Sequence, residues 1–237
     1  MVEPLYRPRE ELVKQSQMYR LQSSLASRHG FSASWSSFHE WSVSHRDLFW
    51  QELLALAEVS PVSPATATCS GEGMLGTSWF PGMTLNFASH LLRFRDEEPA
   101  IVSLDEAGRR RSLCYAELYA LVCRVAAGLR ERGVVRGDRV AGFMPNTLES
   151  VVAMLATASI GAIWSSCSPD FGLGGVVDRF GQIEPKVLFA ADGYQYGGKL
   201  IDCRDRIGGI LDSIPSIACC VVVPFATEAL DSSSLPR

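Results

Sequence analysis

Lysine is scarce in this sequence, and neither sign of charge gathers into long blocks. Only Lys14, Lys186 and Lys199 are present; Lys and Arg together number 22 among 237 residues, against 26 acidic residues, which gives a formal net charge of −4. A protein that binds nucleic acid through the phosphate backbone needs a basic excess or a basic patch. The composition therefore argues against a nucleic-acid partner.

Histidine and cysteine are too few, or too irregularly placed, for a metal centre or a disulfide framework. Of the four histidines, His39 and His45 lie six residues apart and so fall on different faces of a helix. The seven cysteines are odd in number and form no C-x-x-C motif. We therefore expect no metal site, and we expect buried, reduced thiols in a cytoplasmic protein.

Long hydrophobic runs are also rare, and the main candidate, residues 153–169, carries no charge ahead of Asp170. A membrane span needs about 20 mainly apolar residues, and this run is interrupted by Gly161 and by four polar or helix-breaking residues after it. We expect a buried helix followed by a strand whose end turns polar. The N-terminus carries scattered charges without an apolar stretch, so no secretory signal is expected.

The first part of the chain has a helical pattern and leads into a linker. Apolar residues at helical spacing follow Ser44, which we expect to cap a helix from His45 onward. A segment rich in Pro, Ser, Thr and Gly follows and contains GEGMLG at residues 71–76. This matches G-x-G-x-x-G, but no strand precedes it and Glu72 would oppose a pyrophosphate, so we regard the match as coincidence.

From residue 99 onward, short apolar segments alternate with amphipathic ones. This alternation predicts an α/β fold, with a mostly parallel sheet flanked by helices, preceded by a helical N-terminal extension. We expect a helical extension and linker over 1–85 and an α/β domain over 86–237. The expected strands lie at 99–105, 110–114, 138–144, 162–168, 186–191 and 218–225. The expected helices lie at 115–132, 146–160, 174–184 and 198–214.

Several motifs resemble those of the acetoacetyl-CoA synthetases (acetoacetate–CoA ligases), in the adenylate-forming acyl-CoA synthetase superfamily. They are GAIWSSCSPDFG at 161–172, DRFGQIEPKVLF at 178–189, YGGK at 196–199, WFPGMTLNFASHLLR at 79–93 and FHEWSVSHRDLFW at 38–50. The resemblance implies the large domain of an adenylate-forming enzyme and an ATP-dependent ligase, which makes acetoacetyl-CoA from acetoacetate through an acyl-adenylate. ATP with Mg²⁺ and coenzyme A are the implied cofactors of the intact enzyme.

Parts of the family machinery are not found in the sequence. The family uses a Ser/Thr/Gly-rich loop ending in lysine, and a distant lysine, to neutralise phosphate oxygens. The last segment, DSSSLPR, has neither glycine nor lysine. We therefore expect residues 86–237 to be a partial AMP-binding domain that stops before the phosphate-binding loop, in the N-terminal portion of such a ligase. We expect no catalytic residue, no tight cofactor binding and no activity of this chain alone.

Two other interpretations stay open. The acid could be acetate or propionate instead of acetoacetate. The chain could also be a non-catalytic binding or interaction module, because an incomplete sheet could self-associate through its open edge.

The resemblance also implies a ligand-binding region for coenzyme A. The loop after the strand at 162–168 would lie beside the opening for coenzyme A, and a glycine-containing turn would bind its nucleotide phosphate. Lys199 is the implied phosphate contact, and Tyr196 stands where relatives carry arginine. From the pattern alone, the loop is equally consistent with an ordinary connection capped by Ser168 or Asp170, and Lys199 with a solvated residue at a helix start. The candidate cofactor-binding residues are Ser168, Pro169, Asp170, Phe171, Tyr196, Gly197, Gly198 and Lys199.

Overall fold

The computed structural model describes residues 5–226. The chain divides into two compact units, Met1–Leu85 and Asn86–Arg237, which we call unit 1 and unit 2 and describe separately. The DSSSLPR segment considered above lies outside the described residues.

In unit 1, the second, third and fourth helices pack around a small aromatic core. Leu25, Phe38 and Trp41 are its buried centre. Ser16 and Ser34 begin the second and third helices, because each hydroxyl accepts a backbone N–H bond from the first turn. The helices are α1 (Glu10–Gln15), α2 (Gln17–His29), α3 (Trp35–Ser44) and α4 (Arg46–Leu56).

The expected cap at Ser44 is wrong. Ser44 is the last residue of α3, and His45 precedes α4 without any side-chain capping bond. The backbone N–H of His45 donates to Trp41 O at 2.8 Å, which continues the hydrogen-bond ladder of α3. The break between the two helices therefore falls one residue later than the serine suggests.

The glycine-rich segment at 71–76 forms the tip of a small hairpin. The strands β1 (Cys69–Ser70) and β2 (Ser78–Trp79) pair antiparallel, with the one-turn helix α5 (Gly73–Gly76) between them. Gly71 has φ +81°, and a Cβ there would lie 2.1 Å from Gly76 O. The glycine pattern thus serves a tight turn.

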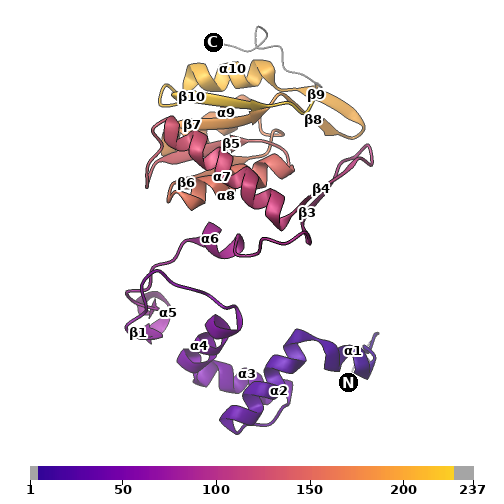
Figure 1. Ribbon diagram of the computed structural model, residues 1–237, viewed down its shortest axis with the longest axis vertical. Helices are drawn as coiled ribbons and strands as arrows, with labels where there is room; N and C mark the ends of the chain where they lie inside the picture. The colour runs from indigo at the N-terminus through magenta and orange to yellow at the C-terminus, as the bar shows by residue number, and fades with distance from the viewer. Residues whose placement is uncertain (1–4, 227–237) are drawn as a thin grey trace. The chain divides into compact units, whose positions relative to one another are not determined.

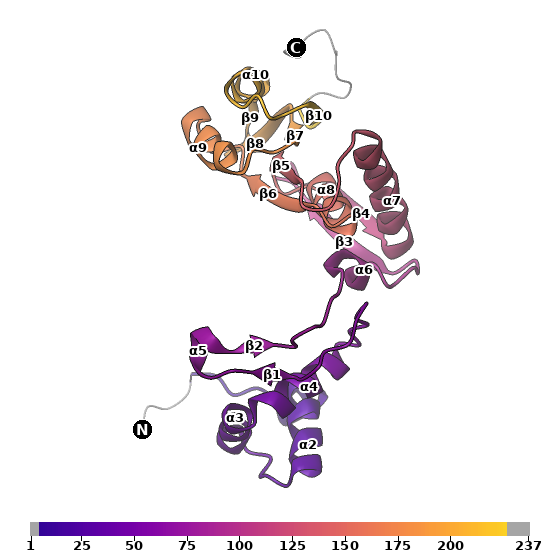
Figure 2. The ribbon, with the colours of Figure 1, turned by 90° about the vertical axis from the view of Figure 1, so that its left-hand side faces the viewer.

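Unit 2 has a four-stranded parallel sheet with helices on both faces, as Figures 1 and 2 show. The strand order is β10-β7-β5-β6. The strands are β5 (Arg139–Phe143), β6 (Ile163–Cys167), β7 (Val187–Ala191) and β10 (Cys219–Val223). The helices are α6 (Phe87–Leu91), α7 (Tyr115–Glu131), α8 (Leu148–Ser159), α9 (Leu173–Ile183) and α10 (Arg204–Ser213). The predicted fold class is confirmed.

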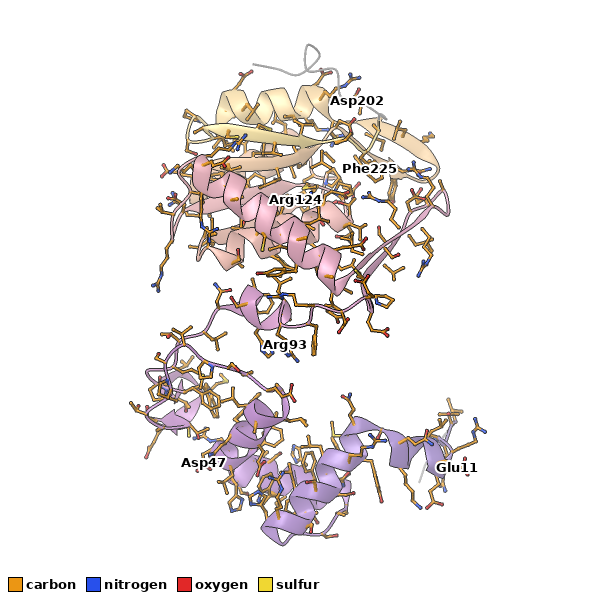
Figure 3. All side chains as sticks on the ribbon, viewed as in Figure 1. Glu11, Asp47, Arg93, Arg124, Asp202 and Phe225 are labelled. Carbon is orange, nitrogen blue, oxygen red and sulfur yellow. The ribbon has the colours of Figure 1, made fainter. Side chains whose placement is uncertain are left out.

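Alternating residues of each strand build two cores on opposite faces of the sheet. Val140 packs with α7 and α8, whereas its neighbour Ala141 packs with α9 and α10. Figure 2 shows these two helix pairs on opposite sides of the strands. Arg124, labelled in Figure 3, is on the exposed side of α7. The uncharged run ends α8, forms β6 and enters the following loop, and no described helix is long and apolar enough to cross a bilayer.

Two antiparallel hairpins stand outside the parallel sheet. One joins β3 (Pro99–Leu104) to β4 (Arg110–Cys114), and the other joins β8 (Gly193–Tyr196) to β9 (Lys199–Asp202). The helix expected from residue 198 is therefore wrong over its first six residues, since α10 begins at Arg204. Gly197 and Gly198 have φ +57° and +75°, values that suit a two-residue hairpin turn.

Side chains also cap α8 and α7. Thr147 caps α8, and its side chain accepts from Ser150 N. Glu149, in the first turn of α8, pairs with Arg111 at 2.5 Å. At α7, the Cys114 thiol takes the place of a hydroxyl: it accepts from Glu117 N at 3.4 Å, and Glu117 bonds back to Cys114 N at 2.9 Å.

Candidate functional site

A hollow of about 270 Å³ lies at the carboxyl ends of β5 and β6. Its walls are residues 144–146 after β5, residues 166–170 at the end of β6, and residues 194–196 of β8. Segments far apart in sequence converge here because the carboxyl ends of parallel strands meet at one edge of a sheet, where α/β proteins bind ligands.

The loop that leaves β6 is held by bonds between its own residues. Ser168 Oγ donates to Asp170 Oδ2 at 2.9 Å, and Asp170 N donates back to Ser168 Oγ at 3.3 Å. Neither side chain caps α9, whose N-terminus starts after Gly172 without a side-chain bond. The interpretation of Ser168 or Asp170 as a helix cap is therefore wrong. Both residues line the hollow instead.

Arg206 of α10 binds the backbone of this loop. The sequence analysis did not identify this residue. Its Nη1 donates to Pro169 O at 2.5 Å. Its guanidinium lies 5.8 Å from the ring centre of Tyr194 and 6.0 Å from that of Phe143. The only sequence signal was an arginine on a helix, which is too common to identify a site.

Two of the groups that line the hollow, the Tyr194 phenol and the Cys167 thiol, have a raised pKa, which favours their protonated forms. Burial raises the pKa of Tyr194; Asp170 acts in the same direction, while Arg206 opposes it. Burial also raises the pKa of the Cys167 thiol, against a smaller lowering by Arg179. A protonated phenol and thiol donate hydrogen bonds, and neither is a ready nucleophile or base. The described residues also form no cluster of potential metal ligands.

The β8–β9 turn already interacts with an anionic group of the same chain. Gly197 N donates to Glu106 Oε1 at 3.3 Å, and Gly198 N donates to Glu106 Oε2 at 2.9 Å. Lys199, next in the chain, is exposed and begins β9, so it is not at a helix start. The turn has the donor groups and the positive charge that an anion requires.

The structure brings together some of the candidate residues and separates others. Ser168, Pro169, Asp170 and Tyr196 line the hollow. Phe171 does not; its ring is covered by the Arg179 guanidinium at 4.3 Å. Gly197, Gly198 and Lys199 form the adjoining turn outside the hollow. Tyr196 belongs to both regions and connects them.

Comparison with known proteins places this geometry in a family. A family model described as AMP-binding enzyme matches residues 87–234. The chain belongs to the AMP-binding enzyme family.

Two named relatives and a solved structure resemble this AMP-binding family member over almost its whole length. Acetoacetyl-coenzyme A synthetase of Rhizobium meliloti is 43% identical over 95% of this chain, and acetoacetyl-CoA synthetase of Gallus gallus is 34% identical over 94%. Acetoacetyl-CoA synthetase from Streptomyces lividans superposes with a TM-score of 0.90 over 97% of the chain, at 41% identity. The chain spans about a third of these proteins, 35% of each of the first two and 36% of the third.

The hollow of this AMP-binding family member does not fit a nucleoside triphosphate. The described residues that line it include no arginine or lysine, and they include the Asp170 carboxylate. A triphosphate needs cations or convergent N–H groups, and a nearby like charge opposes it. The neighbouring turn does fit a phosphate group, since it presents two consecutive N–H donors beside Lys199.

The buried carboxylate at this end of the sheet has a structural role. Asp192, which follows β7, is 1% exposed. Its Oδ1 accepts from Phe225 N at 2.6 Å and from Ala226 N at 2.8 Å. Figure 3 labels Phe225 just beyond β10. Asp192 therefore determines the direction in which the chain leaves the sheet.

Proposed function

We propose that this chain provides the coenzyme A-binding side of an ATP-dependent acid–CoA ligase that forms acetoacetyl-CoA from acetoacetate through an acyl-adenylate. The observation that carries the proposal is its match, at 41–43% identity over at least 95% of its length, to two proteins named as acetoacetyl-CoA synthetases. In such a reaction Mg²⁺-bound ATP activates the acid and coenzyme A accepts the acyl group. The free thiols of the chain suit a cytoplasmic location.

The residues around the hollow have a positioning role in this proposal. Ser168 and Asp170 hold the β6 loop in one conformation, while Arg206 anchors the backbone of Pro169. The protonated Tyr194 phenol presents a donor to a neutral amide or hydroxyl of the ligand. The turn at 196–199 binds the ribose phosphate of coenzyme A, with Lys199 as its cation.

A titration of coenzyme A tests this assignment. We expect weak binding by the wild type and at least threefold weaker binding by Lys199→Ala, because a phosphate loses its nearest cation. The matched control is Lys14→Ala, which removes the same charge from unit 1, where Lys14 pairs with Glu10 at 2.6 Å. Equal affinities of wild type and Lys199→Ala in isothermal titration calorimetry would exclude Lys199 from the site.

The open edge of β10 supports a second, non-catalytic function in self-association. All five residues of β10 are apolar and partly exposed, and among the described residues β10 pairs only with β7. Such an edge lacks the charges that block strand pairing.

We expect concentration-dependent dimers in size-exclusion chromatography. Val221→Lys should shift them to monomer, whereas Val102→Lys on β3 should not; a wild-type monomer at every concentration would contradict this function.

A further inference from the structure

The tips of the two hairpins of unit 2 meet through one carboxylate. Glu106 lies in the turn between β3 and β4, and its two oxygens accept one bond each from Gly197 N and Gly198 N. Both hairpins extend toward the same side of unit 2 in Figure 1. The partners are 91 and 92 residues apart in sequence, so the contact is a product of the tertiary fold.

The turn is shaped to hold an anion. Both glycines have positive φ, and consecutive residues in that conformation direct neighbouring N–H groups to one point. These N–H groups belong to the turn and take no part in the β8–β9 pairing, which ends at Tyr196 and Lys199. A Cβ on either glycine would meet no atom within 4 Å, so the positive φ, and not close packing, accounts for glycine at these two positions.

We propose that Glu106 is an internal competitor, which occupies the phosphate-binding turn and must leave before the ribose phosphate of coenzyme A can bind. This inference rests on the proposed function of the same turn. A carboxylate offers two oxygens and one charge, whereas a phosphate monoester offers three oxygens and about −1.5 to −2 charges at pH 7. With Lys199 beside it, the turn favours the phosphate once both anions are available.

Glu106 is not needed to hold its own hairpin together. The β3–β4 turn is closed by Asp105, whose carboxylate accepts from Arg109 N at 2.9 Å and from Arg109 Nε at 2.6 Å. Gly108 N also donates to Asp105 O at 3.0 Å. The Glu106 side chain is exposed, and within residues 5–226 it accepts hydrogen bonds from the two glycines only. Its removal should therefore leave the fold intact.

Competition within one molecule reduces apparent affinity by a definite factor. A tethered group acts at an effective concentration in the millimolar range or above. If the turn is open in about one molecule in ten, the apparent dissociation constant is about tenfold larger than that of an open turn. Glu106 would then account for part of the weak coenzyme A binding that we expect of the wild type.

Titration of coenzyme A and of dephospho-coenzyme A into Glu106→Ala tests the inference. We expect coenzyme A to bind Glu106→Ala about three- to tenfold more tightly than wild type. Dephospho-coenzyme A lacks the ribose phosphate and should bind both proteins equally. The matched control is Glu131→Ala, which removes an exposed carboxylate at the end of α7 and should change neither affinity.

The contact itself has an independent readout without ligand. In ¹⁵N-edited NMR spectra, the amide resonances of Gly197 and Gly198 should move in Glu106→Gln and stay in place in the Glu131 variant. Unmoved glycine resonances would overturn the inference, and so would equal coenzyme A affinity in wild type and Glu106→Ala. An equal gain for dephospho-coenzyme A would overturn it too, because the effect would then be general electrostatics.

One further outcome separates the inference from the function on which it rests. If coenzyme A binds neither wild type nor Glu106→Ala at millimolar concentration, the proposed phosphate site fails and the inference fails with it. If coenzyme A binds both equally and Lys199→Ala weakens it, the site stands and only the role of Glu106 is overturned.

Discussion

Single residues at the centre of unit 2 are constrained by close packing. Gly142 of β5 lies under the indole of Trp164, and a Cβ there would be 2.5 Å from Cζ2 and 2.6 Å from Cη2. Trp164 in turn is 6.1 Å from Phe189 between ring centres and packs against the core shared with α7 and α8. Trp164 is thus a structural residue and is not among the residues that line the hollow.

Gly142→Ala should therefore destabilise the protein. An added methyl group in a filled core forces strain of about 1–3 kcal/mol. The matched control is Gly181→Ala in α9, where a Cβ meets nothing within 4 Å. That change should stabilise the helix by about 0.5–1 kcal/mol. Urea denaturation measures the free energy of unfolding of each variant. Equal values for the two variants would contradict the packing argument.

At the scale of elements, unit 1 depends on one carboxylate that joins two helices. Glu52 of α4 accepts from Arg28 Nη1 of α2 at 2.8 and 2.7 Å, and lies 3.2 Å from His29 Nε2. Although burial raises the pKa of Glu52, its hydrogen bonds and charge interactions with His29 and Arg28 lower it below the ordinary 4.5. The charged form of Glu52 is thus favoured in the folded state.

Acid should remove this stabilisation. A carboxyl group with a lowered folded-state pKa stabilises the fold fully above its unfolded pKa of 4.5, and the contribution disappears as pH falls through the lower folded value. At pH 7, Glu52→Gln should reduce the free energy of unfolding of unit 1 by about 0.5–1 kcal/mol. Tryptophan fluorescence during urea unfolding measures this free energy of unfolding. A difference between wild type and Glu52→Gln that does not shrink below pH 4.5 would be inconsistent with this pairing.

At the scale of the whole molecule, the hollow and the β8–β9 turn are the proposed binding surface, and the residues described there do not include the groups that activate an acid. The hollow has no cationic lining residue, and its phenol and thiol keep their protons. The nearest anion site, the β8–β9 turn, is occupied by Glu106. Acyl-adenylate formation needs donors that neutralise charge developing on phosphate oxygens.

We therefore expect no acetoacetate-dependent exchange of pyrophosphate into ATP by this chain. A radiolabelled pyrophosphate-exchange assay measures the reaction directly, with a full-length acetoacetyl-CoA synthetase as positive control. Exchange above background that depends on acetoacetate would show that the chain activates the acid by itself. Weak coenzyme A binding without exchange is the expected combination.

The strands of the parallel sheet and most helices were predictable because their signals are local. The runs at β5, β6, β7 and β10 are short, apolar and separated by amphipathic segments, so side-chain periodicity indicates them without knowledge of the fold. The β8–β9 hairpin also had a local signal in Gly197-Gly198, although the helical pattern that follows it obscured the turn. The helix caps were less predictable, because Asn146 and Thr147 are both good caps and geometry chose between them.

The sequence by itself determined the α/β class, the position of the β6 loop at a strand end and the family resemblance, since all three depend on residue order and local pattern. Only the tertiary structure decided that Arg206 holds Pro169 and that Glu106 occupies the turn at Gly197 and Gly198. These partners are 37 to 92 residues apart, and their meeting depends on how packed helices and hairpins approach one another. No local preference of either partner encodes such an approach.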